Sequence, residues 1–292
     1  SNGGQYRTSS RYTDGWTREH DDTLVLFCYG NWNGSNPNEQ FVWEPGLAKN
    51  FLTVGALHDG SDVVDVDSSS IAGLNQVSSL NNRSIPADGR LKPEVNGPGK
   101  WITAPVVNDS YADYQGCSMA TPHVAGVVAL LEEAYGGGGG AGGLTANQHK
   151  AVLVATTGPV ENPNGYAAGY GSVDALNAIY ENDYESLQRF YGGSIGEQEA
   201  QTHSFSVPSG AEAVVVSMSW LDPKASANSQ DTLVNDLDLF VGPENDPWRY
   251  ALADTNQNVL KQVIDDPQTG DWVVTVYGWE VEDDGSFTWA QQ

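Results

Sequence analysis

The sequence predicts an α/β part with a mainly parallel sheet, followed by an antiparallel β-sandwich or jelly-roll domain. Three observations lead to this prediction. The first half has continuous apolar runs separated by helical stretches, and the last third has alternating apolar residues. The length of 292 residues suits two domains at about 150 residues each. Because the texture changes near residue 195, we expect the α/β part to cover residues 1–195 and the β domain residues 196–292.

Continuous apolar runs in the first part are typical of strands that are buried on both faces. Residues 23–29 and 50–56 have this pattern, and the polar segment 13–22 is predicted to be helical. Residues 119–134 are apolar or small nearly all round, which predicts a central helix buried on every side. Strands separated by helices indicate βαβ units and a mainly parallel sheet. The glycine-rich segment 136–143 is interpreted as a surface loop, because no strand precedes it and no Lys-Ser or Lys-Thr follows it.

In the second part, apolar residues alternate along short segments that are bounded by turn formers. The alternating positions are Val214, Val216, Met218 and Trp220, then Leu237, Leu239 and Val241, and then Trp272, Val274 and Val276. This pattern predicts antiparallel strands with one face in a core. We expect the tryptophans of this part to belong mainly to that core, with an aromatic binding face as the alternative: Trp220, Trp248, Trp272, Trp279 and Trp289.

The composition excludes two classes of function. With 13 basic and 38 acidic side chains the formal charge is −25, so a phosphate backbone would be repelled and nucleic-acid binding is not expected. The sequence has no run of about 18 apolar residues, so no membrane-spanning helix is expected. Only 17% of the residues are charged, and the imbalance therefore reflects a shortage of lysine and arginine. Such a surface remains soluble where salt screens repulsion, so we expect an extracellular protein in a saline medium.

The segment 116–126 places Ser118 at the start of the helix that is predicted to be buried. The first N–H groups of a helix have no intrahelical partner, and the dipole makes this end positive. A developing oxyanion beside Ser118 would be stabilised by this field and by a backbone N–H. Pro122 falls in the first turn, where its missing donor costs little. From these residues alone, the alternative is a serine that only caps a core helix.

This segment closely resembles the serine motif of the subtilisin-like serine proteases, Gly-Thr-Ser-Met-Ala-x-Pro-x-Val-x-Gly, with Cys117 in place of the threonine. Other segments resemble the family in the same order along the chain. They are Tyr29-Gly30-Asn31, Leu52-Thr53-Val54-Gly55-Ala56, 87–95 with 97–99, and 169–174. Residues 233–239 are similar to a stretch in the C-terminal β-barrel of one subgroup. The resemblance covers the chain from near Thr13 to its C-terminus.

The resemblance implies a subtilisin-like three-layer α/β domain, incomplete in this chain, and a serine endopeptidase that acts on proteins or peptides without a required cofactor. It implies that Ser118 forms the acyl-enzyme, and that the Asn31 amide and the Ser118 N–H hold the oxyanion. It also implies that Gly30 and Gly116 belong to the substrate-binding site.

The sequence departs from the family in its first residues. The family's catalytic Asp and His motifs precede the oxyanion asparagine, and the 30 residues before Asn31 contain no counterpart of either motif. We therefore expect the chain to be the C-terminal portion of a protease and to be inactive alone. The histidines offer no substitute base, and His123 is expected to be a packed or hydrogen-bonded core residue. The alternative is a non-catalytic pseudoprotease or binding protein that acts through its β domain.

The two cysteines lie next to the residues of interest. Cys28 is three residues before Asn31, and Cys117 directly precedes Ser118. If the family fold holds, both segments converge on the active site, and a disulfide between them is conceivable. Two buried free thiols are the alternative.

Oxygen-bearing side chains of the β domain make a structural calcium ion conceivable. They are Asn235, Asp236, Asp238, Asp254 and Asn256. Calcium prefers such ligands, but their spacing matches no dedicated calcium loop. The alternative is that these side chains lie on solvated strand faces of an acid-rich protein.

Overall fold

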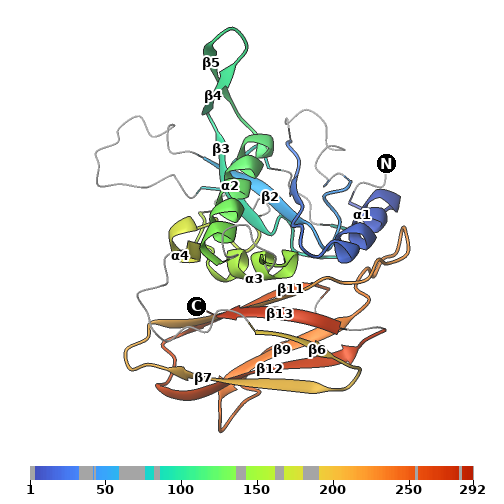
Figure 1. The fold of residues 1–292 in the computed structure, drawn as a ribbon, viewed down its shortest axis with the longest axis vertical. Helices are drawn as coiled ribbons and strands as arrows, with labels where there is room; N and C mark the ends of the chain where they lie inside the picture. The colour runs from blue at the N-terminus through green and yellow to red at the C-terminus, as the bar shows by residue number, and fades with distance from the viewer. Residues whose placement is uncertain are drawn as a thin grey trace.

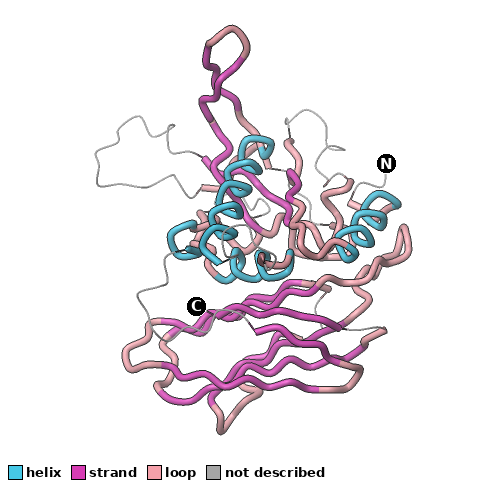
Figure 2. Tube along the Cα trace, in the orientation of Figure 1, coloured by secondary structure: helices cyan, strands magenta, loops and turns pink. Residues whose placement is uncertain are grey.

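The computed structural model describes residues 4–32, 42, 44–58, 76–81, 86–135, 143–161, 168–179, 191–253, 256–282 and 285–291. The described chain runs through an α/β part and then a β-rich region, which confirms the predicted order of the two classes. Figure 2 shows that the helices are confined to the first part, whereas the second consists of strands and loops.

The α/β part is built on a short parallel sheet with the order β1-β2-β3. Strand β1 (Leu26–Cys28) pairs with β2 (Leu52–His58), and β2 pairs with β3 (Val95–Lys100). The residues of β2 are buried up to Leu57, because this strand lies in the middle of the sheet. The predicted parallel sheet is therefore confirmed, although β1 is shorter than the apolar run 23–29 from which it was predicted.

Helices surround this sheet. They are α1 (Thr8–Glu19), α2 (Cys117–Tyr135), α3 (Ala146–Ala155) and α4 (Ala175–Ile179). Helix α2 packs across all three strands, and its buried residues Ala120, Val124 and Leu131 share one core with the strands (Figure 1). A thr-capped turn begins α3, where Thr145 and Gln148 form a capping box.

Helix α2 is not buried on every side, which corrects the expectation from its apolar composition. Pro122, His123 and Ala129 are exposed, and Leu130 has 47% of its surface exposed. The reason is that the described sheet packs against only one side of α2. The composition of a helix reports how apolar it is, but not how many of its faces the described chain covers.

A two-stranded hairpin projects from the α/β part just before α2 (Figure 1). It consists of β4 (Ile102–Val106) and β5 (Ser110–Tyr114), which pair antiparallel. Tyr111 and Val107 near its tip are exposed. The hairpin leads directly into Gly116 and the start of α2, and the sequence analysis did not predict it.

The β-rich region consists of two four-stranded antiparallel sheets, in the orders β10-β9-β12-β7 and β11-β8-β13-β6. Its strands are β6 (Tyr191–Ile195), β7 (Ala200–Val207), β8 (Ala213–Trp220), β9 (Asp236–Pro243), β10 (Tyr250–Leu252), β11 (Val259–Asp265), β12 (Gly270–Glu280) and β13 (Gly285–Gln291). The predicted alternating residues of β8, β9 and β12 lie in one core shared by both sheets. Trp220, Trp272 and Trp289 are buried in it, whereas Trp248 and Trp279 are exposed.

A buried polar interface joins the two parts. Helix α3 packs against β8 and β13, and the ammonium of Lys49 contacts the Asp222 carboxylate with both side chains fully buried. Lys49 Nζ also donates to the carbonyl oxygens of Pro223 at 2.6 Å and Thr232 at 2.5 Å. Asn50 exchanges hydrogen bonds with the backbone of Asp222, both at 2.9 Å. Burying such groups is costly unless each is paired, so the interface has a specific geometry.

The predicted boundary after residue 195 assigns β6 to the first part. In the structure, however, β6 pairs with β13 and belongs to the sheet of the β-rich region. The glycine-rich segment lies outside the described residues except for Gly143. None of the helices in the described part of the chain combines the length and the apolar character that crossing a membrane requires.

Candidate active site

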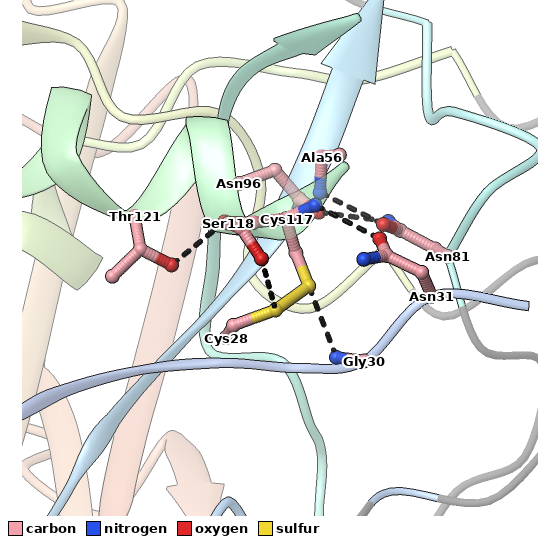
Figure 3. Close-up of a disulfide and its surroundings, with 9 residues drawn as sticks. All are labelled: Cys28, Gly30, Asn31, Ala56, Asn81, Asn96, Cys117, Ser118 and Thr121. Atoms are coloured by element: carbon pink, nitrogen blue, oxygen red, sulfur yellow. Dashed lines mark hydrogen bonds between the residues drawn. A yellow bond between two sulfur atoms is a disulfide. The ribbon is translucent and has the colours of Figure 1, made fainter. Parts of the chain in front are cut away.

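Ser118 lies at the N-terminal end of α2, close to the loop that follows β1 (Figure 3). It is the second residue of the helix and is exposed to solvent. The N–H groups of the first turn have no intrahelical acceptor, and the helix dipole is positive at this end. The hydroxyl of Ser118 therefore stands where negative charge developing on a bound substrate would be stabilised.

Asn31 reaches the same helix end from the loop after β1. Its Oδ1 accepts a hydrogen bond from the backbone N–H of Cys117 at 2.9 Å. The amide nitrogen Nδ2 then remains to donate to a substrate, and it points toward the side on which the Ser118 hydroxyl lies (Figure 3). The Trp32 N–H donates to the Leu80 carbonyl at 2.7 Å, and Asn31 forms a β-bridge with Asn81.

Gly30 and Gly116 allow the two segments to approach each other closely. Gly116 has a φ of 138°, and a Cβ at this position would lie only 2.9 Å from Asn31 Nδ2. Gly30 has a φ of 111°, and its N–H donates to Cys117 Sγ at 3.2 Å. Both positions therefore require glycine, for backbone conformation and, at Gly116, for space. The structure brings the four predicted site residues together: Ser118, Asn31, Gly30 and Gly116.

A disulfide joins Cys28 to Cys117, so the alternative of two free thiols is wrong in this structure. The two Cα atoms are 5.2 Å apart, and the bond closes a sequence separation of 89 residues. Cys28 Sγ lies 3.8 Å from the hydroxyl oxygen of Ser118. The crosslink therefore belongs to the candidate site itself.

Two buried asparagines that the sequence analysis missed support the strands behind the site. Asn81 Oδ1 accepts the Ala56 N–H at 2.8 Å, which connects the loop beside Asn31 to β2 (Figure 3). Asn96, in β3, donates from Nδ2 to the carbonyl oxygens of Ala168 and Gly171. A polar residue inside an otherwise buried strand was the available signal for Asn96, whereas Asn81 follows no strand pattern.

All five histidines lie in the described residues, and each has a partner elsewhere. His123 is exposed rather than buried in the core, and its Nδ1 lies 2.8 Å from the Met119 carbonyl oxygen. This corrects the expectation of a core histidine. The others contact groups away from Ser118: His20 with Trp16, His58 with Lys100, His149 with Glu132, and His203 with Tyr191 and Trp289.

The charged residues of the segment 87–95 form buried pairs before the start of β3. Lys92 Nζ lies 2.5 Å from Glu94 Oε1, and Lys150 Nζ lies 3.0 Å from the same oxygen. Burial lowers the pKa of Lys92 to about 7, although the nearby Glu94 carboxylate opposes this change. Burial alone would raise the pKa of Glu94, but the cations of Lys150 and Lys92 outweigh it and lower that pKa. Since Glu94 lies before β3 and Asn31 lies after β1, these charges are at opposite ends of the parallel sheet from the candidate site.

A polar cleft of about 710 Å³ lies between α1, the N-terminal end of α3 and the β-rich region. Arg18, Thr145 and Lys224 are among its lining residues. It contains neither Ser118 nor Asn31, so its size alone does not identify the site of chemistry. The convergence of a nucleophile, a helix end and an amide donor is the more informative feature.

The possible calcium ligands are used in other ways where the structure describes them. Asn235 Oδ1 accepts the Glu282 N–H at 3.0 Å, and Asn256 Nδ2 donates to the Asp88 carbonyl at 2.7 Å. Asp254 lies outside the described residues. Within the described ranges, no group of three or more His, Cys, Asp or Glu side chains could hold a metal ion. A calcium ion thus stays an untested prediction.

Comparison with known families gives a match over most of the α/β part. The model of the subtilase family, Peptidase S8, matches residues 1–193. Serine protease AprX of Bacillus subtilis is 29% identical over 190 residues, a match that covers 56% of this chain and 40% of AprX. The C5a peptidase of Streptococcus pyogenes serotype M18 is 38% identical over 64 residues, covering 22% of this chain and 6% of that protein.

Other similarities are more limited. Bacillopeptidase F of Bacillus subtilis is 35% identical over 97 residues, covering 30% of this chain and 6% of that protein. A solved structure of the prenylagaramide maturation protease PagA matches with a TM-score of 0.42 and 23% identity, over 55% of this chain and 51% of that chain. The chain spans less than half the length of the curated relatives named here.

Proposed function

Because the chain belongs to the subtilase family, we propose that it supplies the nucleophile and the oxyanion donors of a serine endopeptidase. The family and its serine protease relatives already support a serine peptidase. The observation that supports the assignment of residues most directly is the hydrogen bond from the Cys117 N–H to Asn31 Oδ1. This bond holds the Asn31 amide beside the helix end that carries Ser118.

In the proposed reaction, Ser118 Oγ attacks the carbonyl carbon of a peptide bond while a base accepts the hydroxyl proton. The carbonyl oxygen becomes negatively charged, and Asn31 Nδ2 and the Ser118 N–H donate hydrogen bonds to it. Collapse of this intermediate expels the amine and leaves an ester on Ser118, which water then hydrolyses. A single donor of this kind typically contributes about 10²–10³ in kcat.

The base is the part of the reaction that the described residues do not supply. Each of the five histidines contacts another partner, and His123 is engaged by the Met119 carbonyl of its own helix. We propose that the histidine and the carboxylate that orients it are not among the residues of this chain. The isolated chain should then hydrolyse peptides very slowly, because the Ser118 hydroxyl is a weak nucleophile without a base.

Substrate binding is proposed to involve the backbone at Gly30 and Gly116, where the absence of a side chain leaves room beside Asn31. Proteins or peptides are the proposed substrates, and no cofactor is required by this chemistry. The net charge of −25 supports an extracellular location in a saline medium, because salt screens the repulsion between acidic side chains.

The β-rich region is proposed to be a β-sandwich of the jelly-roll type and a separate domain, with the boundary placed before β6 rather than after it. Two antiparallel sheets with one common core support this assignment. A second candidate function, a non-catalytic protein that binds through this region, is favoured by the exposed rings of Trp248 and Trp279.

A fluorophosphonate probe, which reacts with activated serine hydroxyls, tests the proposal on the full-length protein that contains this chain. Mass spectrometry of the digested protein should find the label on Ser118. Ser118→Ala should abolish labelling, whereas the exposed Ser209→Ala should leave it unchanged. If the full-length protein is not labelled at Ser118, the endopeptidase assignment fails and the binding function becomes the better explanation.

A further inference from the structure

The Cys28–Cys117 disulfide joins the two segments that carry the candidate oxyanion donors. Cys28 is the last residue of β1, three residues before Asn31, and Cys117 is the first residue of α2, directly before Ser118. Among the described strands, β1 pairs only with β2 and has three residues. The crosslink therefore gives this short edge strand a second attachment, to the helix that carries Ser118.

Cys117 also holds the loop after β1 through its backbone and its sulfur. Its N–H donates to Asn31 Oδ1 at 2.9 Å, and its Sγ accepts the Gly30 N–H at 3.2 Å. These two contacts fix the amide of Asn31 and the peptide that precedes it. Both depend on the distance between the loop and the helix end, which is the distance that the disulfide restrains.

We propose that the Cys28–Cys117 disulfide is a positioning element of the oxyanion site, and that its reduction slows the reaction at Ser118. This inference rests on the proposed function. When the crosslink opens, the loop after β1 is free to move away from α2, and Asn31 Nδ2 loses its alignment with the Ser118 N–H. Misplacement of a catalytic group by about 1 Å is enough to reduce a rate substantially.

The site also determines how the bond is reduced. Cys28 is only half-buried and its sulfur lies 3.8 Å from the exposed Ser118 hydroxyl, whereas Cys117 is fully buried. A small thiolate would therefore attack Cys28 Sγ, forming a mixed disulfide and releasing the Cys117 thiolate. The helix N-terminus and the Gly30 N–H stabilise that leaving thiolate before it takes a proton. A second thiol then releases Cys28 as a thiol, so that two external thiols are oxidised to one disulfide.

The experiment compares oxidised and dithiothreitol-reduced full-length protein on a peptide substrate, at a temperature well below the unfolding midpoint of the reduced form. We expect reduction to lower kcat about 10- to 100-fold, less than or near the loss for a missing donor, with KM changed by less than about twofold. Reoxidation should restore kcat. The double variant Cys28→Ala/Cys117→Thr should have the low kcat of the reduced protein and should not respond to dithiothreitol.

Hydrogen exchange gives a second readout that does not depend on activity. Reduction should increase exchange over residues 28–32 and leave the β-rich region unchanged, whereas general loosening of the fold would raise exchange in both. If Ser118 is labelled by the fluorophosphonate probe but reduction leaves kcat unchanged, the positioning role is wrong and the endopeptidase assignment stands. If Ser118 is not labelled in the oxidised protein, both are overturned.

Discussion

The β-rich region and the α/β part are stabilised by different kinds of interaction. The β-rich region has two four-stranded sheets around a core that includes the buried rings of Trp220, Trp272 and Trp289. The described sheet of the α/β part has three strands, and buried charges such as Lys92 and Glu94 lie inside this part. Burial of apolar rings does not depend on pH, whereas a buried charge cluster depends on the protonation of its members.

The proposed chemistry lies in the part whose core is less complete. Strand β1 is short, one side of α2 is exposed, and the loop carrying Asn31 is attached through few contacts, one of which is a disulfide. Elements that bind ligands are commonly drawn from the less stable parts of a protein. The difference teaches that the β-rich region acts as a support, and that the Lys49–Asp222 interface connects this support to the site-bearing part.

Among the largest effects expected is one where the two parts meet. Asp222→Ala removes the buried partner of Lys49 and should lower the free energy of unfolding by about 3–5 kcal/mol. Urea unfolding followed by tryptophan fluorescence measures the loss. The exposed Asp231→Ala is the matched control and should change stability by less than about 0.5 kcal/mol. A loss below about 1 kcal/mol for Asp222→Ala would show that the interface does not couple the two parts.

A comparable effect is expected inside the β-rich core. Trp220 is buried and its indole N–H donates to the Asn235 carbonyl at 3.1 Å, so Trp220→Ala should cost about 3–5 kcal/mol. The exposed Trp279→Ala should cost less than about 1 kcal/mol in the same urea titration. Equal losses for the two variants would contradict the placement of the core.

The next effect concerns rate rather than stability. In the full-length protein, Asn31→Ala should lower kcat about 10²–10³-fold, which corresponds to about 2.7–4 kcal/mol of transition-state stabilisation. Unfolding free energy should fall by no more than about 1.5 kcal/mol, the value of one lost hydrogen bond. The exposed Asn245→Ala should keep the original kcat. An unchanged kcat in Asn31→Ala would remove this residue from the proposed mechanism.

The smallest effect sharpens the contrast between buried charges and buried rings. The pKa of folded Glu94 lies below its ordinary value of 4.5, so the unfolded chain binds the proton first as pH falls through that value. Stability from this group is therefore complete above pH 4.5 and is lost as pH falls toward the lower folded pKa. Glu94→Gln should reduce the pH dependence in this window by at most about 1.4 kcal/mol per pH unit, measured by urea unfolding at several pH values. An unchanged acid dependence would contradict the charge assignment.

The β-rich region was predictable from the sequence because its signal is local. Val214, Val216, Met218 and Trp220 alternate, and period-2 alternation places one face in a core whatever the partner strand is. Helix α2 was also predicted, and it begins two residues before the predicted start at Met119. The hairpin of β4 and β5 was missed because it carries no strict alternation and includes Pro105 and exposed aromatic residues.

The candidate site was predictable in its members but not in its contacts. Ser118 and Asn31 came from motif resemblance, whereas their approach depends on how β1 and α2 pack. The disulfide between Cys28 and Cys117 was left open beside two free thiols, because spacing alone does not fix the distance between two sulfurs. Lys49 and Asp222 are 173 residues apart, and no local pattern relates them. The exposed side of α2 was missed because composition does not show what covers a helix.

A crystal structure of the full-length protein after reaction with a peptidyl phosphonate tests the central claim most directly. The proposed function predicts a covalent bond from Ser118 Oγ to phosphorus. It also predicts that the phosphonyl oxygen accepts hydrogen bonds from Asn31 Nδ2 and the Ser118 N–H at about 2.7–3.1 Å. A phosphonate attached to another residue, or a phosphonyl oxygen with no bond to Asn31 Nδ2, would contradict the claim that these two segments form the catalytic site.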